Sequence, residues 1–341
     1  MAQLVSVARA RSVLNGAVLL AVLGARLASA QQEQPYSLGY PLAAGANQAP
    51  AAGSGAFTQS VAIDVPSYHG LEPRLVLGYS SDATTGLAGA GWGLSGFSVI
   101  ERAKPGRGTP RYDANDIFLL DGAELIPCPT SGPSASCSAG GTHSTKKESY
   151  LKIRRDDPSA NKWTVWGRDG TKTVFDATFT TSTGGIFRWG QKTVTDMNTN
   201  PNTVTYAWYC ADDPAIAGIQ IQDCYPDSVT YGPYTVKLYL EDRTDKRSFA
   251  TGDTSRLGKT TYRLRSVLVS YNAARVRAYK LAYKVGGSAV TGRSLLETVE
   301  QYGSDVVIDA SGVISGVSPL PARRFTYKSD TAGSSFQSWP N

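Results

Sequence analysis

The sequence is poor in the residues from which many enzymes and metalloproteins build their sites. It has only two histidines and two methionines, and its four cysteines include no C-x-x-C pair, the spacing typical of a structural zinc site. No G-x-S-x-G nucleophile elbow accompanies either histidine. We therefore expect no catalytic residue, no cofactor and no bound metal.

Long apolar runs are missing beyond the N-terminus. The one run, at residues 13–25, is shorter than the ~20 residues that a membrane-spanning helix needs. Two arginines precede it, and an A-x-A cleavage site after it ends at Ala30. This order predicts a signal peptide over residues 1–30, removed before Gln31, and hence a secreted protein that is periplasmic or extracellular.

Charge of either sign is sparse, at 18% of residues against the ~25% of typical soluble proteins. The net charge is +6, and three arginines of the predicted signal peptide supply half of it. Because the remaining lysines and arginines form no dense cluster, nothing indicates a nucleic-acid partner. Residues 31–55 are rich in Ala, Gly, Gln and Pro, which predicts a flexible leader.

The four cysteines form two local pairs, Cys128 with Cys137 and Cys210 with Cys224, each around a loop of turn-forming residues. Four cysteines allow three connectivities. We expect the local one, because export permits disulfides and each bond would close a single hairpin loop. Each closure is worth about 2–3 kcal/mol in the chain-entropy model. Reduced, inert thiols are the alternative.

Residues 57–102 carry the densest strand signals. Apolar and polar residues alternate before and after a Pro/Gly break, and five glycines then bracket Trp92. So much glycine around one large aromatic residue indicates backbone that passes close over a packed ring. We expect the core to include Ile63, Val65, Leu75, Leu77, Tyr79, Trp92 and Phe97.

The segment GWGLSG at residues 91–96 satisfies the dinucleotide-binding pattern G-x-G-x-x-G literally. A nucleotide site requires a helix to begin there, so that its N-terminal amides face the pyrophosphate. Residues 97–100 favour a strand instead, since they read Phe-Ser-Val-Ile. We therefore interpret the motif as a structural turn.

From Arg111 onward, short apolar and aromatic runs alternate with turn residues. Asp121-Gly122, the strongest short hairpin signal, separates two such runs. No 12-residue window shows helical periodicity. These patterns predict an all-β fold of many short antiparallel strands in hairpins, forming a meander, a sandwich, a barrel, a curved sheet or a partial β-shell.

Three motifs occur in an order that resembles a known family. They are I-x-V-P at 63–66, G-L-x-P-x-L-x-L-x-Y-S-S at 70–81 and G-x-G-W-x-L-S-G at 89–96. This order is similar to the N-terminal region of SpvB/TcdB-type proteins, found in the B component of Tc insecticidal toxins and in a plasmid virulence protein. Later hairpins resemble the units that precede tyrosine-aspartate (Rhs/YD) repeats, which extends the resemblance over 57–328.

After the signal peptide (1–30) and the leader (31–55), the resemblance implies two further segments: a Gly-rich N-terminal β segment (56–110) and a β-hairpin shell region (111–341). In that family the region forms part of the wall of a hollow shell that encloses a toxic polypeptide. Propeller-like and YD-repeat regions usually follow, and this sequence lacks them. We expect a non-enzymatic scaffold of a secreted, virulence-associated toxin, either functional as it stands or a truncated or split member. Its expected partners are further β-repeat or toxin-subunit chains.

The family's virulence protein carries an ADP-ribosyltransferase in a separate C-terminal domain, which needs an E-x-E motif. This sequence has none. Glu297 and Glu300 are three positions apart on an expected strand, so they would face opposite sides of the sheet. Transferase activity is therefore not expected here.

The main alternative is a secreted glycan- or partner-binding module. Trp163, Trp166, Trp189 and Trp208 could form a sugar-binding platform if they lie in one exposed row. Inward-facing rings would instead indicate packing across strands.

Two further patterns have simpler structural readings. Asp196-x-Asn198-x-Asn200 imitates the start of a calcium loop, but Pro201 stands where the sharp turn needs glycine, which favours an Asx-rich turn. His69 and His143 lie in turn-rich segments without a nucleophile context. We interpret both histidines as structural.

Overall fold

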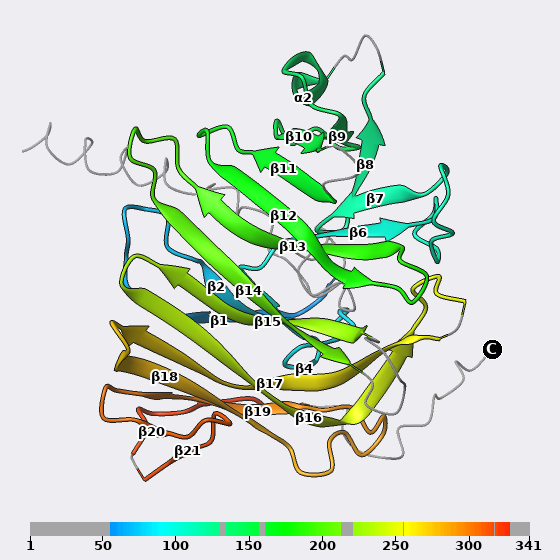
Figure 1. Ribbon diagram of the computed structural model, residues 1–341. Helices are drawn as coiled ribbons and strands as arrows, with labels where there is room; N and C mark the ends of the chain where they lie inside the picture. Colours follow the sequence, from blue (N-terminus) through cyan, green and yellow to red (C-terminus); the bar gives the residue numbers. More distant parts are fainter. Residues whose placement is uncertain are drawn as a thin grey trace, which may run out of the picture. The chain divides into compact units, whose positions relative to one another are not determined.

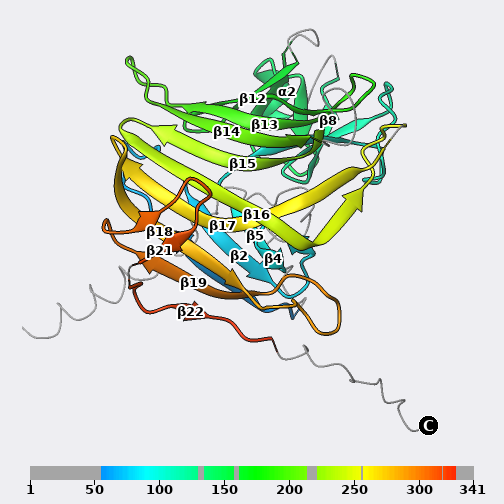
Figure 2. The ribbon, with the colours of Figure 1, turned by 60° about the horizontal axis from the view of Figure 1, so that its bottom comes forward.

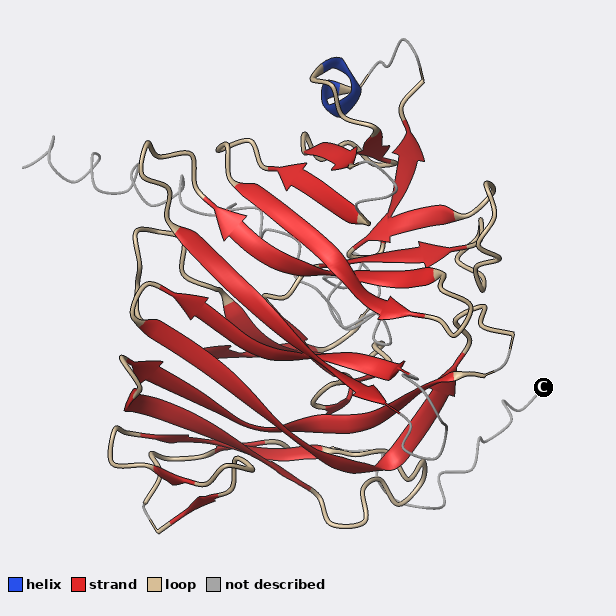
Figure 3. Ribbon diagram, viewed as in Figure 1, coloured by secondary structure: helices blue, strands red, loops and turns tan. Residues whose placement is uncertain are grey.

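The computed structural model describes residues 55–129, 134–156, 161–212, 221–254, 256–316 and 318–327, all within one compact unit, Ser37–Asn341. The predicted signal peptide, its cleavage site between Ala30 and Gln31, and nearly all of the leader lie outside these residues. Antiparallel strands form almost all of the described regular structure, and the one described helix is α2 (Ala135–Ser138) (Figure 3). The all-β prediction is confirmed.

The N-terminal strands form a small sheet with the order β1-β2-β5. β1 (Thr58–Ile63), β2 (Leu75–Ser80) and β5 (Trp92–Ser95) pair antiparallel. Between β2 and β5 the glycine-rich segment makes a short hairpin from β3 (Thr85–Gly86) and β4 (Gly89–Ala90). Buried residues alternate along β1 and the start of β2, which is the period of two expected for a strand with one face on the core.

The next eight strands form a closed, barrel-like ring. Each pairs with its successor, and β13 returns to pair with both β12 and β6, which closes the circle. The hairpin between β7 and β8 turns at Asp121 and Gly122, whose φ angles are both positive, as a type I′ turn requires. The ring strands are β6 (Val99–Ala103), β7 (Ile117–Leu120), β8 (Ala123–Pro127), β9 (His143–Thr145), β10 (Lys152–Arg155), β11 (Lys162–Trp166), β12 (Lys172–Thr180) and β13 (Ile186–Thr195).

Longer strands continue the same sheet beyond the ring (Figure 1). β6 and β14 share one side of β13, because Gly190 pairs with Val99 and Val194 pairs with Val204. The sheet therefore forks at β13 into the ring and an open part. The open part contains β14 (Thr203–Asp212), β15 (Ile221–Tyr231), β16 (Tyr234–Phe249), β17 (Gly258–Tyr271), β18 (Ala274–Tyr283), β19 (Leu296–Tyr302) and β22 (Arg323–Arg324), while β20 (Val307–Ile308) and β21 (Ile314–Ser315) pair separately.

The two largest of the four buried hydrophobic clusters in the described residues result from this arrangement. The small sheet packs against the open part, where Leu77, Trp92 and Phe97 share one buried cluster with Val229 and Val267 (Figure 2). The removal of this apolar surface from water is the main force that holds the two sheets together. The ring encloses a second core, made of Ile100, Phe118, Leu120, Leu125, Ile153, Trp163, Val165, Phe175 and Trp189.

Two of the seven residues expected in the core, Val65 and Tyr79, are only half-buried and lie at its margin. β1 ends before Val65, and the N–H of Asp64 donates to the hydroxyl of Tyr279 (2.9 Å) instead of a β2 carbonyl. Tyr79 stands near the end of β2, beside the exposed ring of Phe57. The buried five are Ile63, Leu75, Leu77, Trp92 and Phe97.

Candidate functional site

The glycine-rich hairpin is shaped by close backbone approach. Gly89 and Gly91 have φ angles of 103° and 74°. A Cβ on Gly89 would lie 2.7 Å from the carbonyl oxygen of Ser294, and a Cβ on Gly91 would lie 2.5 Å from the ring of Tyr79. Strand β5 lies inside the G-x-G-x-x-G motif and β6 follows it, so no helix begins there. The motif is a point of close sheet contact.

A buried ion pair of β16 supports this hairpin. Arg243, 1% exposed, donates to the carbonyl oxygen of Gly86 (3.4 Å) and pairs with Asp245 (2.9 Å). Asp245 also accepts hydrogen bonds from the backbone N–H (2.9 Å) and hydroxyl (2.6 Å) of Ser294. Burial by itself would raise the pKa of Asp245, but the hydrogen bonds from Arg243 and Ser294 outweigh it and lower that pKa. The ionised carboxylate thus joins β16 to the segment before β19.

A second ionic cluster lies where the sheet forks, and we call Arg188, Glu101 and Asp223 the fork cluster. Arg188 of β13 is fully buried and donates to Asp223 of β15 (3.0 Å) and to Glu101 of β6 (3.2 Å). Asp223 is also fully buried, and it accepts a hydrogen bond from the hydroxyl of Thr260 on β17 (3.0 Å). One arginine therefore links a ring strand, the shared strand and the open part.

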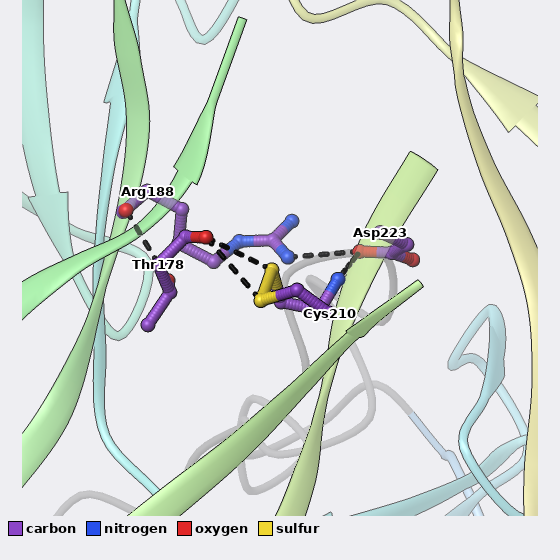
Figure 4. Close-up of a disulfide and its surroundings, with 5 residues drawn as sticks. Thr178, Arg188, Cys210 and Asp223 are labelled. Carbon is purple, nitrogen blue, oxygen red and sulfur yellow. Dashed lines mark hydrogen bonds and ion pairs between the residues drawn. A yellow bond between two sulfur atoms is a disulfide. The ribbon is translucent and has the colours of Figure 1, made fainter. Parts of the chain in front are cut away.

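The Cys210–Cys224 disulfide lies beside the fork cluster (Figure 4). Its cysteines are direct cross-strand partners in β14 and β15. The carbonyl oxygen of Thr178 lies 3.3 Å and 3.1 Å from the two sulfurs, and Figure 4 shows the side chain of Arg188 extending past them toward Asp223. The disulfide thus closes β14 on β15 next to the charged residues that join β15 to the ring.

The other disulfide joins Cys128, just after β8, to Cys137 in α2. The hydroxyl of Ser136 in the same helix accepts a hydrogen bond from the N–H of Ile153 on β10 (2.9 Å). The two contacts hold the short helix against the ring. Both disulfides have the local connectivity that the sequence favours.

The tryptophans considered as a sugar platform do not form an exposed row. Trp163 and Trp189 are buried inside the ring, with 0% and 1% of their surface exposed. Trp208 is half-buried and its indole N–H donates to the carbonyl oxygen of Gln191 (2.9 Å). Trp166 is also half-buried. In the described part of the chain these rings pack across strands.

The two histidines occupy different environments. His69 is exposed, in a turn with positive φ. His143 lies in the ring core on β9, with its ring 4.9 Å from that of Trp163 and 5.9 Å from that of Phe118, measured between centroids. Burial, and secondarily the positive charge of Arg155, lowers the pKa of His143 to about 4. His143 is thus a neutral core residue at physiological pH.

This burial predicts a pH dependence of stability. In the unfolded chain His143 takes up a proton near pH 6.5, whereas the folded protein takes it up only near pH 4. The unfolded state therefore gains relative stability as pH falls through this window, and the free energy of unfolding should decrease by about 3 kcal/mol. Urea denaturation between pH 7 and 4 measures the effect. His143→Phe keeps an aromatic ring without a titrating proton, so its curve should be flatter by that amount; parallel curves would contradict the assignment.

The calcium-like segment forms an Asx turn. The carboxylate of Asp196 accepts hydrogen bonds from the backbone N–H (3.0 Å) and side-chain amide (2.7 Å) of Asn202, and from the same groups of Asn198 (3.2 Å and 2.7 Å). Within the residues that the structure describes, no group of three or more His, Cys, Asp or Glu side chains is placed to hold a metal ion. No helix in that part of the chain has the length and apolar character needed to cross a membrane.

The sequence gives little sign of the buried ion pairs. Arg188 meets Asp223 at a separation of 35 positions and Glu101 at 87 positions. The one local signal is a charged residue between two large aromatics, Phe187 and Trp189, in an expected strand. An alternation argument would place Arg188 on the polar face, and only the fork of the sheet buries that face.

Comparisons with known proteins agree with this architecture. The N-terminal domain of effector protein SpvB from Salmonella typhimurium strain LT2 matches with a TM-score of 0.56 at 14% identity, covering 71% of this chain and 98% of that one. A Tc holotoxin pore from Photorhabdus luminescens matches with a TM-score of 0.61 at 16% identity, covering 80% of this chain and 16% of that one. The TcdB2-TccC3 structure matches with a TM-score of 0.59 at 16% identity, covering 80% and 17%.

At these identities the structural matches establish a shared fold. The chain spans about one sixth of the length of the two Tc toxin chains and corresponds to nearly the whole SpvB N-terminal domain. No curated protein sequence matches it. The family model described as Salmonella virulence plasmid 65kDa B protein matches residues 51–250, which is more than half of the chain. The chain therefore belongs to the SpvB family.

Proposed function

We propose that this chain is a non-enzymatic scaffold of an exported, toxin-associated protein, and that it extends a β-sheet shell by pairing with further strands. Membership of the SpvB family and the fold shared with Tc toxin components support the toxin association. The signal-peptide pattern that ends at Ala30 supports export. The cross-linked, continuous sheet supports a structural role.

The observation that carries the proposal is the outer edge of β22, the strand that pairs with β19 at the end of the sheet. The N–H of Phe325 donates to the carbonyl oxygen of Glu297 (2.9 Å), and the pairing continues into β22. Because N–H groups alternate in direction along an extended antiparallel strand, those of Arg324 and Thr326 point away from β19. Within the described residues no strand pairs with that outer edge. Such an edge is a template for a further strand.

The test is the solution mass of the purified chain Gln31–Asn341, measured by light scattering during size exclusion. We expect self-association or aggregation, relieved by co-expression with the protein of the neighbouring reading frame. A monodisperse monomer that does not bind that protein would contradict the scaffold and favour the glycan-binding alternative, for which a glycan array would follow.

A matched pair of variants localises the contact. Thr326→Pro removes an N–H that faces away from β19, so it should weaken association while the pairing with β19 remains. Thr326→Ser keeps the N–H and should behave as the original chain. Equal association of the two variants would place the contact elsewhere.

A further inference from the structure

Two arginines on different strands of the barrel-like ring lie close to the side chain of Phe118. Arg102 of β6 and Arg155 of β10 place their guanidinium carbons 5.2 Å and 4.9 Å from the ring centroid of Phe118. Arg155 also lies 5.8 Å from the ring centroid of Trp163. We call Arg102, Phe118, Arg155 and Trp163 the inner basic cluster. Arg102 is the cross-strand partner of Phe118, and Arg155 is that of Trp163, so the curved ring brings two neighbouring-strand pairs together.

The charges of this cluster are not balanced. Of the carboxylates in the described residues, only that of Asp116 makes an ion pair with the cluster, 3.5 Å from Arg102. That carboxylate already accepts hydrogen bonds from the backbone N–H groups of Arg111 (2.9 Å) and Tyr112 (2.6 Å). Among the described residues, no carboxylate pairs with Arg155. The neighbouring His143 is neutral, so the cluster keeps an excess of positive charge.

Buried hydrogen-bond donors in the cluster also lack acceptors. Within the described part of the chain, the Nε of Arg102 and the indole Nε1 of Trp163 are buried without a hydrogen-bond partner. Trp163 is fully buried, and a buried N–H without a partner is unfavourable and uncommon. The other two buried indoles have partners: that of Trp92 donates to Tyr327 (2.9 Å) and that of Trp189 donates to Asn161 (3.0 Å).

We propose that the inner basic cluster binds a compact oxyanion, a carboxylate or a phosphate, between Arg102 and Arg155. Guanidinium groups match the geometry of both anions and bind them through paired hydrogen bonds. The anion would supply the missing negative charge and an acceptor for the unpartnered donors. Arg155 is half-buried, so part of its side chain is accessible to solvent and to a dissolved anion. This site is independent of the sheet edge proposed above.

The test measures thermal unfolding of the purified chain with increasing sodium phosphate or sodium acetate, against sodium chloride at equal ionic strength. We expect a saturable rise in melting temperature of several degrees with at least one of the two anions. A response to acetate alone identifies a carboxylate site, and a response to phosphate alone identifies a phosphate site. No saturable response to either would overturn the proposal.

Two neighbouring arginines provide the controls. Arg155→Met should abolish the saturable response, whereas Arg154→Met should retain it, because Arg154 is exposed and pairs with Asp156 (2.7 Å). If Arg155→Met does not fold, Arg155→Lys keeps the charge but loses the paired donors, and should shift half-saturation at least several-fold higher. In NMR spectra the indole N–H signal of Trp163, assigned with Trp163→Phe, should move with anion concentration. An equal thermal response in the Arg155 variants would overturn the proposal.

Discussion

Trp92→Ala should lower the free energy of unfolding by about 3–5 kcal/mol, the usual loss for a large buried aromatic residue. Trp92 is 1% exposed and packs against Phe325 and Tyr79, at ring-centroid distances of 4.7 Å and 5.3 Å. Its indole N–H donates to the hydroxyl of Tyr327 (2.9 Å), which donates to the carbonyl oxygen of Leu296 (2.7 Å). The substitution therefore removes a core ring and one of the contacts that hold the segment after β22.

Guanidinium denaturation measures this loss, and hydrogen exchange locates it. The amide of Phe325, bonded to Glu297, should exchange faster in Trp92→Ala than in the original chain. Trp92→Phe keeps most of the apolar volume without the indole N–H, so an intermediate loss is expected. Trp166→Ala removes a half-buried tryptophan and should cost much less. Equal stability of Trp92→Ala and the original chain would refute the packing role.

Arg188→Met should destabilise the fold by about 3–5 kcal/mol at neutral pH, because it removes the buried arginine that neutralises Asp223 and Glu101. The side chains of Arg188 and Asp223 are both fully buried, and the Nη1 of Arg188 lies 3.0 Å from the Oδ1 of Asp223. Methionine fills much of the space but brings no charge and no donor. Since protonation removes the charge of a carboxylate that has lost Arg188, the loss of stability should shrink as the pH is lowered. Denaturation curves of both proteins at pH 7 and pH 5 test this.

An exposed pair of similar chemistry is the control for Arg188→Met. Lys146 lies 3.0 Å from Glu124, but their side chains are 64% and 30% exposed. Lys146→Met should therefore change stability by less than about 1 kcal/mol at either pH. Similar losses in the two variants would contradict the role assigned to the fork cluster.

The features that could be predicted from the sequence are local ones. The turn at Asp121-Gly122 follows from two residues that tolerate positive φ, and the alternation at Leu75 and Leu77 marks a half-buried strand. The pairing of Cys210 with Cys224 follows from closure of a single hairpin. Each signal lies within about fifteen residues, where chain connectivity restricts the possible partners.

The pairing of strands that are distant in the sequence does not follow from such local signals. Nothing around Gly190 indicates that one side of its strand pairs with both β6 and β14. The sequence patterns allow a barrel among other all-β architectures, but they indicate neither the fork nor which strands close the ring. The departure of Val65 from the core has the same origin, because a tyrosine more than 200 positions away takes the N–H of Asp64. These features depend on which distant strands meet, and a local pattern carries no information about that.

The contact between Trp92 and Tyr327 spans 235 positions, and this has a consequence for folding during synthesis. A chain that emerges N-terminus first presents Trp92 to the solvent until nearly all other described residues have followed. The ring also forms late, because the ion pair between Glu101 and Arg188 needs residues that are 87 positions apart. Contacts between residues so far apart in the sequence slow folding and leave strand edges unpaired for longer. For the exported protein proposed above, this order means that the chain lacks its long-range contacts until late in synthesis.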